Sequence, residues 1–182
     1  TVNISITAVN DAPTGTVQSV TGNEDAAQTI TLAGSDADGD ALTYALATNP
    51  SNGTSTLSGN VVTYTPNTNY NGSDSFTFTA SDGEYTSDPA TVNTTVTAVN
   101  DVPVIASTPA LDALDGSLYE YSVSVNDVDG DAVTMTAPTK PDWLAISNNN
   151  SNYVLSGTPG SSDGGLHDII LSATDGNGGV VT

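Results

Sequence analysis

The chain contains no cysteine and almost no positive charge. Of its 182 residues, Lys140 is the single lysine, none is arginine and one is histidine, whereas 21 are Asp or Glu, so the formal net charge is −20. The absence of cysteine excludes disulfides and cysteine-ligated zinc. One lysine can neither build the basic surface that nucleic acids require nor hold the chain to anionic lipid. We therefore expect no nucleic-acid partner and no direct membrane insertion.

Long apolar runs and helix-forming residues are also scarce. No stretch reaches the length of about 18 apolar residues that a membrane span needs, and no signal-peptide pattern is present. We expect a soluble part of a longer, secreted or cell-surface protein, in which metal ions replace disulfides as clamps. Glu, Lys, Arg, Gln and Met are rare, whereas Thr, Ser, Asn, Asp and Gly dominate. This composition predicts an all-β fold, and the length suits two domains of about 90 residues.

An internal repeat indicates tandem modules. The sequence TVNISITAVND at 1–11 returns as TVNTTVTAVND at 91–101, with eight of eleven positions identical. A repeat of this period is typical of modules in series. Both copies alternate apolar and polar residues and end in Asn-Asp-x-Pro, which predicts a strand that ends at a module boundary. We expect an orphan strand and linker at 1–11, a β-sandwich at 12–101, and a second β-sandwich, lacking its last strand, at 102–182.

Short alternating segments separated by Asn-Gly and Asp-Gly turns predict the strands. Residues 75–80 (SFTFTA) form the clearest half-buried segment, with Tyr44 and Tyr64 as expected core partners, and Trp143 is expected to cap the second core. Such short strands predict two β-sandwiches. The predicted strands are 27–32, 42–47, 55–58, 61–65, 75–81 and 90–98 in the first module, and 119–125, 132–137, 144–147, 153–157 and 168–174 in the second.

The segment at 1–9 has the character of the final strand that should begin at 179–182. One explanation is that it belongs to an upstream module. The other is that it completes the second module of a neighbouring molecule by strand addition, which would give a head-to-tail fibre.

Two acidic motifs lie 91 residues apart, Asp-Ala-Asp-Gly-Asp at 36–40 and Asp-Val-Asp-Gly-Asp at 127–131. Carboxylates this close repel one another unless a cation lies among them, and Ca²⁺ is the first candidate because it takes oxygen ligands. Solvated turns on an acidic surface are the alternative. A self-contained EF-hand loop is excluded, because its required Gly at position 6 and Glu at position 12 are both missing. Those positions hold Ala41 and Ala47 in one motif, and Ala132 and Pro138 in the other.

The ordered motifs resemble cadherin-type arrays. The first module resembles the tandem cadherin-like repeats of bacterial adhesins, on Ala-Val-Asn-Asp-Val-Pro at 98–103, Asn-Glu-Asp at 23–25, the acidic motif at 36–40, Tyr-Asn-Gly-Ser-Asp-Ser-Phe at 70–76 and Ala-Ser-Asp-Gly at 80–83. The second resembles the dystroglycan-type cadherin-like module, on the acidic motif at 127–131, Pro-Asp-Trp-Leu at 141–144, Leu-Ser-Gly-Thr-Pro at 155–159 and Ala-Thr-Asp-Gly at 173–176. Together the two cover nearly the whole chain, and they imply Ig/cadherin-like sandwiches.

The resemblance also implies Ca²⁺ sites whose ligands come from a linker and from the modules beside it. Asp74 is a further candidate, but the acidic pair that cadherins carry before this strand is not reproduced, so the number of ions per junction stays open. Asp40 and Asp131 either bind the ion or cap their turns. The upper site of the first module would use Asn10, Asp11, Asp36, Asp38 and Asp82, and the site between the modules would use Glu24, Asn100, Asp101, Asp127, Asp129 and Asp175.

Catalysis has few groups available, because His167 is the only histidine and no Gly-x-Ser-x-Gly elbow is present. We expect a non-catalytic, calcium-rigidified extender of a large bacterial extracellular adhesin or surface fibre. Its partners would be neighbouring modules of the same chain or head-to-tail copies. The dystroglycan-type resemblance suggests an alternative, a module that binds polysaccharide or a cell-surface protein. Its aromatic platform would come from Tyr119, Tyr121, Trp143 and Tyr153, unless these are core residues.

Overall fold

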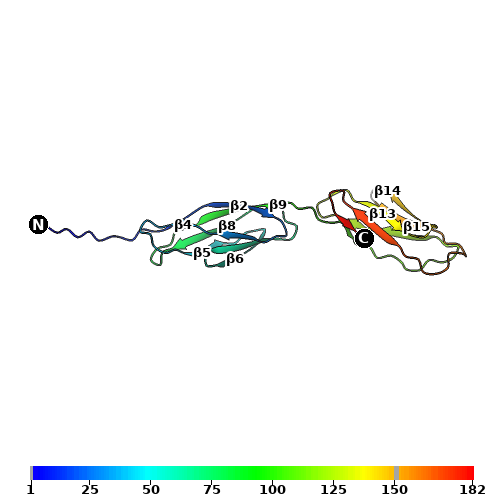
Figure 1. The fold of residues 1–182 in the computed structure, drawn as a ribbon, viewed down its shortest axis with the longest axis horizontal. Helices are drawn as coiled ribbons and strands as arrows, with labels where there is room; N and C mark the ends of the chain where they lie inside the picture. Colours follow the sequence, from blue (N-terminus) through cyan, green and yellow to red (C-terminus); the bar gives the residue numbers. More distant parts are fainter. Residues whose placement is uncertain (1, 150–151) are drawn as a thin grey trace. The chain divides into compact units, whose positions relative to one another are not determined.

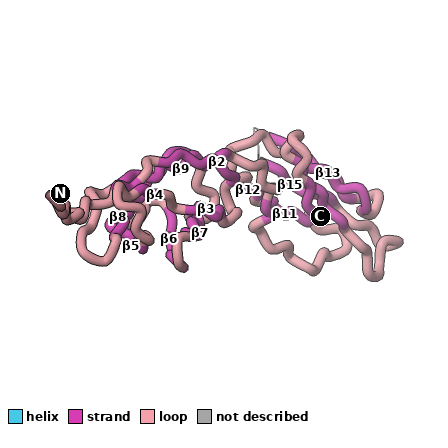
Figure 2. The backbone as a smooth tube through the Cα atoms, turned by 60° about the vertical axis from the view of Figure 1, so that its left-hand side comes forward, coloured by secondary structure: helices cyan, strands magenta, loops and turns pink. Residues whose placement is uncertain are grey.

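A computed structural model describes residues 2–149 and 152–182. Within these ranges the chain consists of strands and loops (Figures 1 and 2). The described part therefore holds no helix with the length and apolar character needed to cross a membrane. The chain divides into two compact units, unit 1 (Thr1–Val99) and unit 2 (Asn100–Thr182). Both are all-β, as the composition predicts.

Unit 1 is a sandwich of two sheets, with strand orders β2-β9-β8-β5 and β3-β7-β6. Strand β2 runs parallel to β9, and the other neighbouring pairs of these sheets are antiparallel. The strands are β2 (Gln18–Asn23), β3 (Gln28–Thr31), β5 (Thr43–Thr48), β6 (Gly53–Ser58), β7 (Val61–Pro66), β8 (Gly72–Ser81) and β9 (Ala90–Thr97).

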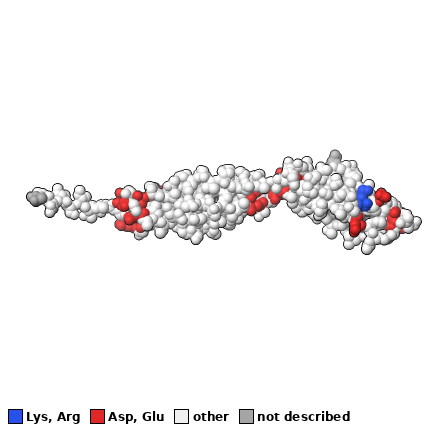
Figure 3. Space-filling model, viewed as in Figure 1, with Lys and Arg blue, Asp and Glu red and all other residues white. Residues whose placement is uncertain are grey.

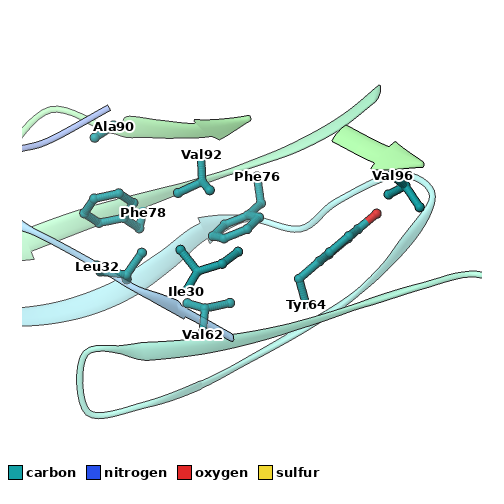
Figure 4. Packing of buried hydrophobic residues seen from close by; sticks show 9 residues of the cluster. All are labelled: Ile30, Leu32, Val62, Tyr64, Phe76, Phe78, Ala90, Val92 and Val96. Carbon is teal, nitrogen blue, oxygen red and sulfur yellow. The ribbon is translucent and has the colours of Figure 1, made fainter. Parts of the chain in front are cut away.

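The core of unit 1 follows from the two-residue period of its strands. Phe76, Phe78 and Ala80 alternate along β8 with threonines, and their side chains are fully buried. Figure 4 shows the two phenylalanines facing the side chains of the opposite sheet. The prediction that Tyr64 belongs to this core is confirmed, and Tyr44 packs against the core while partly exposed. The opposite sheet contributes Ile30, Val62 and Tyr64, and β9 contributes Val92 and Val96.

Unit 2 repeats the two-sheet design, with orders β11-β15-β14 and β13-β16-β17. Its core gathers Tyr119, Tyr121, Met135, Leu144 and Leu155, and Trp143 packs against it while partly exposed. The strands are β11 (Tyr119–Val123), β13 (Thr134–Thr139), β14 (Leu144–Asn149), β15 (Asn152–Gly157), β16 (Ile170–Thr174) and β17 (Val180–Val181).

Each unit also has a two-stranded ladder at its start. In unit 1, β1 (Thr14–Gly15) pairs with β4 (Gly34–Ser35), and in unit 2, β10 (Val104–Ile105) pairs with β12 (Val125–Asn126). The single strand predicted at 119–125 was wrong, because it is divided between β11 and β12. The chain leaves one sheet at Ser124, whose N–H donates to Ser107 Oγ at 2.8 Å, and pairs next with β10.

Strand β2 was missed, because Val20 is the one large apolar residue among its six positions. At the N-terminus, residues 2–9 form no strand within the described chain (Figure 1). The side chains of Val2, Ile4 and Ile6 are exposed. Thr1 of the predicted segment lies outside the described residues. Near the other end, β17 pairs with β16 through Val180 and Val181, where the sequence predicts that a final strand begins.

Candidate metal centre

The sheet topology brings three distant segments together in each unit. The β1–β4 ladder holds the segment at Asn10 and Asp11 beside the acidic motif at 36–40, because the motif follows β4 directly. Strand β5 then starts after the motif and pairs with the end of β8, where Thr43 lies opposite Ser81. Asp82 follows Ser81 and so lies at the same end of the sandwich. In unit 2, the β10–β12 ladder and the β13–β16 pair place the corresponding segments in the same way.

In unit 1, hydrogen bonds join all five residues that the sequence assigns to the upper site. Asn10 Nδ2 donates to Asp82 Oδ2 at 2.9 Å, and the N–H of Asp11 donates to Asp38 Oδ2 at 2.8 Å. The N–H groups of Asp38 and Asp40 both donate to Asp36 Oδ1, at 2.9 and 3.2 Å. The acidic motif therefore folds around the carboxylate of its first residue, Asp36.

Unit 2 contains the same arrangement. Asn100 Nδ2 donates to Asp175 Oδ2 at 2.9 Å, and the N–H of Asp101 donates to Asp129 Oδ2 at 2.7 Å. Asp127 Oδ1 accepts from the N–H of Asp129 at 3.0 Å and from that of Asp131 at 3.2 Å. Carboxylate oxygens of Asp127, Asp129 and Asp131 lie within 4.8 Å of one another. Of the six residues assigned to this site, unit 2 thus brings together five.

The sixth, Glu24, belongs to unit 1 and is only 3% exposed. Its Oε1 accepts from the N–H of Val99 at 2.8 Å, and its own N–H donates to the Thr97 carbonyl at 3.0 Å. Glu24 therefore holds the end of unit 1 at the residue that precedes Asn100 in the chain.

Some carboxylate oxygens in these segments are buried without a hydrogen-bond partner among the described residues. They belong to Glu24 (Oε2), Asp36 (Oδ2) and Asp127 (Oδ2). A buried, unpaired carboxylate oxygen is costly, because it loses its water without compensation. The other side-chain atoms of the site that could bind a metal ion are also oxygens, which a hard divalent cation such as Ca²⁺ prefers. The donor set therefore fits Ca²⁺.

The carboxylates of Asp82 and Asp175 are held in the charged form. Hydrogen bonds from the N–H of Tyr85 and from Asn10 lower the pKa of Asp82 below its ordinary value. The pKa of Asp175 is lowered chiefly by the amide of Asn100, and further by the N–H groups of Asn177 and Gly179. Charged carboxylates are the form that binds a metal ion. On the face shown in Figure 3, the acidic side chains of unit 1 gather at its two ends.

Two further residues shape the unit 2 site, and sequence reasoning missed both. Asn177 Nδ2 donates to Asp131 Oδ2 at 2.7 Å, which ties the loop after β16 to the acidic motif. The N–H of Gly179 donates to Asp175 Oδ1 at 3.0 Å, and a Cβ at this position would overlap Asp175 Oδ2. Spacing from Asp175, within the sequence Asp-Gly-Asn-Gly-Gly, is the only signal that could have found them.

Asp74, the further candidate ligand, has a different role. It is 9% exposed and accepts hydrogen bonds from the N–H groups of Ser51 (3.0 Å) and Asn52 (2.9 Å) and from the hydroxyl of Tyr64 (3.1 Å). Burial by itself raises the pKa of Asp74, but the backbone donors outweigh burial and lower it. All of these partners are internal to unit 1, so Asp74 anchors the loop between β5 and β6 rather than joining the acidic motif.

Comparison with protein-family models now identifies both units. Residues 10–95 match the family described as "Bacterial Ig domain", and residues 102–182 match the one described as "Putative Ig domain". The chain is a tandem of two bacterial Ig-like domains. A search of curated proteins found no match.

Solved structures similar to the Ig-like pair include cadherin ectodomains. The human desmocollin-1 ectodomain has a TM-score of 0.55 at 12% identity, over 93% of this chain and 39% of that one. Protocadherin gammaB7, in a cis-dimer structure, has a TM-score of 0.55 at 17% identity, over 94% of this chain and 45% of that one. An endo-fucoidan hydrolase from glycoside hydrolase family 107 is 26% identical over 93% of this chain, with a TM-score of 0.41. The Ig-like pair spans only 27% of that hydrolase. The cadherins thus support the cadherin-like sandwich fold. The matches to Ig-like family models point to a structural or adhesion role.

Proposed function

We propose that the two Ig-like domains are calcium-rigidified extender modules of a large bacterial extracellular adhesin or surface fibre. In this role they space a binding tip away from the cell surface and carry out no catalysis. The proposed module boundaries are 12–101 and 102–182, with residues 1–11 as a linker and the last strand of a preceding or neighbouring module.

The observation that carries this proposal is a feature that both units share. In each, the linker is hydrogen-bonded to the acidic motif, and one carboxylate oxygen of that motif is buried without a hydrogen-bond partner. In unit 1, Asp11 is hydrogen-bonded to the acidic motif, and Asp36 Oδ2 is buried without a partner. In unit 2, Asp101 is likewise hydrogen-bonded to the acidic motif, and Asp127 Oδ2 is buried without a partner. A random acidic surface would not repeat this arrangement in two domains.

Ca²⁺ needs six to eight oxygens, more than one acidic motif supplies, so the linker residues complete the shell. Asn100 and Asp101 continue the chain directly from Val99, which Glu24 holds in unit 1. An ion bound by the linker and by the acidic motif of unit 2 restricts the dihedral angles of the linker. The proposed ligands are Asn10, Asp11, Asp36, Asp38 and Asp82 for one site and Glu24, Asn100, Asp101, Asp127, Asp129 and Asp175 for the other.

Thermal unfolding and small-angle scattering test the proposal, with Ca²⁺, Mg²⁺ or a chelator present. Ca²⁺ at about 100 times its Kd should stabilise the fold by about 2.7 kcal/mol per site. It should also narrow the distribution of particle lengths, and Mg²⁺ should do neither at the same concentration. The double variant Asp36→Asn with Asp127→Asn should lose the response. Asp88→Asn, an exposed carboxylate outside both motifs, should keep it. The proposal would be refuted if neither Ca²⁺ nor the chelator changed the thermal unfolding or the scattering of the wild-type chain.

A second candidate concerns strand pairing by the N-terminal segment. Val2, Ile4 and Ile6 alternate with polar residues, and their side chains are 86%, 82% and 90% exposed. An apolar face of this kind suits pairing with another sandwich, either an upstream module or a second copy. Size-exclusion chromatography at rising concentration distinguishes these: self-pairing gives concentration-dependent oligomers that deletion of residues 1–9 abolishes, and a strict monomer refutes it.

A further inference from the structure

Unit 2 contains a cavity of about 460 Å³ that none of the proposed calcium ligands lines. Two loops, at 109–115 and 159–169, form its walls, and Tyr119, Leu155 and Leu171 from the strands form its floor. The volume lies within the range of small-molecule sites. The cavity is therefore separate from the candidate metal centre.

The walls of the cavity carry aromatic rings set at right angles. The ring of Trp143 lies 6.3 Å from that of Tyr119 and 6.4 Å from that of His167, with an interplanar angle of 84° in both pairs. The hydroxyls of the tyrosines are already used, because Tyr119 donates to the Ala110 carbonyl at 2.9 Å and Tyr121 to the Ser107 carbonyl at 3.0 Å. The tyrosines thus offer a ligand their rings rather than their hydroxyls.

One polar atom of these walls lacks a partner. The indole Nε1 of Trp143 is buried and makes no hydrogen bond to any described residue. A buried indole N–H normally finds an acceptor, and leaving it without one costs free energy. Because this N–H is shielded from solvent, it is not available to a ligand, and Trp143 contributes only its ring to the cavity.

The negative charge of the lining residues favours a positively charged ligand. Asp112, Asp115 and Asp163 line the cavity, and neither Lys140 nor any other cationic side chain does. Asp163 is engaged internally, since its Oδ2 accepts from the N–H of Gly160 and its carbonyl from Nε2 of His167. Asp112 and Asp115 thus supply negative charge beside aromatic rings, a combination that attracts cations and repels anions.

We propose that this cavity binds a compact organic cation of the quaternary-ammonium type. The aromatic rings and the carboxylates of Asp112 and Asp115 attract the cationic head. Neutral sugars fit less well, because they need several polar partners and the tyrosine hydroxyls are engaged.

Choline and its uncharged isostere 3,3-dimethylbutan-1-ol test the proposal on the full chain. Trp143 is the only tryptophan, so its fluorescence and its indole N–H resonance report directly on the cavity. Choline should bind saturably, about tenfold or more tighter than the isostere, in line with a cation–π contribution. Equal affinity for the two, or binding of a neutral glucose oligosaccharide without binding of choline, would overturn the proposal.

Variants separate charge from shape. Asp112→Asn with Asp115→Asn should weaken choline binding at least threefold and leave the isostere unaffected, since only the charge changes. Trp143→Phe keeps a ring but offers a weaker cation–π partner, so it should weaken choline binding more than binding of the isostere. Isothermal titration calorimetry measures this, because the variant has no tryptophan, and circular dichroism checks its fold. Asp88→Asn in unit 1 is the control. If the double Asn variant binds choline as the wild type does, the electrostatic argument fails even when folding is intact.

Discussion

The side-chain amide of Asn100 donates to Asp175 Oδ2 across 2.9 Å, although the two residues are 75 positions apart. Asn10 and Asp82 make the same bond at the same length in unit 1. This contact connects each linker to the loop that closes its sandwich. It also lowers the pKa of the carboxylate, so that the residue stays charged where the acidic motif meets the linker.

Replacing Asn100 by alanine should raise the pKa of Asp175 toward its ordinary value of 3.8, because the amide is the main cause of its depression. A depressed carboxyl pKa stabilises the fold above the unfolded value, and this contribution is lost as pH falls through the folded value. Acid unfolding of unit 2 should therefore begin at higher pH in Asn100→Ala. Carboxyl ¹³C NMR titration measures the shift directly. An unchanged Asp175 titration would show that the amide does not govern this carboxylate.

Gly179→Ala should disturb Asp175, since the added Cβ would overlap its Oδ2. We expect the stabilisation of unit 2 by Ca²⁺ to be lost or strongly reduced, measured as the difference in Tm with and without the ion. Gly164→Ala is the matched control, because a Cβ there meets no atom within 4 Å. Full retention of the Ca²⁺ response in Gly179→Ala would argue against Asp175 as a ligand.

Asp74→Ala should destabilise unit 1 by about 3 kcal/mol, because it leaves buried donors from the 51–52 loop and from Tyr64 unpaired. Tyr64→Phe removes only one of these bonds and should cost about 1–2 kcal/mol. Urea unfolding measures both. Neither variant should alter the Ca²⁺ affinity of unit 2, and a change there would return Asp74 to the list of metal ligands.

Tyr64 should ionise late in alkaline solution. Burial, and then the hydrogen bond to Asp74, raise its pKa from 10.0 to about 12. A raised pKa stabilises the fold fully below the unfolded value, and the contribution is lost as pH rises from about 10 to about 12. Absorbance at alkaline pH should show a late phenol transition that is missing in Tyr64→Phe. If the late transition persists in that variant, it belongs to another tyrosine.

The local pattern of apolar and polar residues predicted much of the fold. The alternation in β8 was enough to predict its buried face, since a strand exposes every second side chain regardless of its neighbours. The segment predicted at 61–65 matches β7 (Val61–Pro66) closely. Strand pairing was harder to predict. Strand β2 lies parallel to β9 although Val20 is its only large apolar residue, and its position depends on a partner 74 positions away, as Gln18 pairs with Val92. The division between β11 and β12 likewise depends on β10.

The sequence by itself determined that the chain is an acidic, cysteine-free tandem of β-modules and that its carboxylates recur at matching positions. Composition and short-range periodicity are local properties and survive without a fold. Only the tertiary structure decided which carboxylates share a site. A side-chain hydrogen bond joins Asn100 to Asp175 across 75 positions of the sequence, and burial turns Asp74 inward to Tyr64. It also opened a cavity beside Trp143, which no spacing in the sequence predicts.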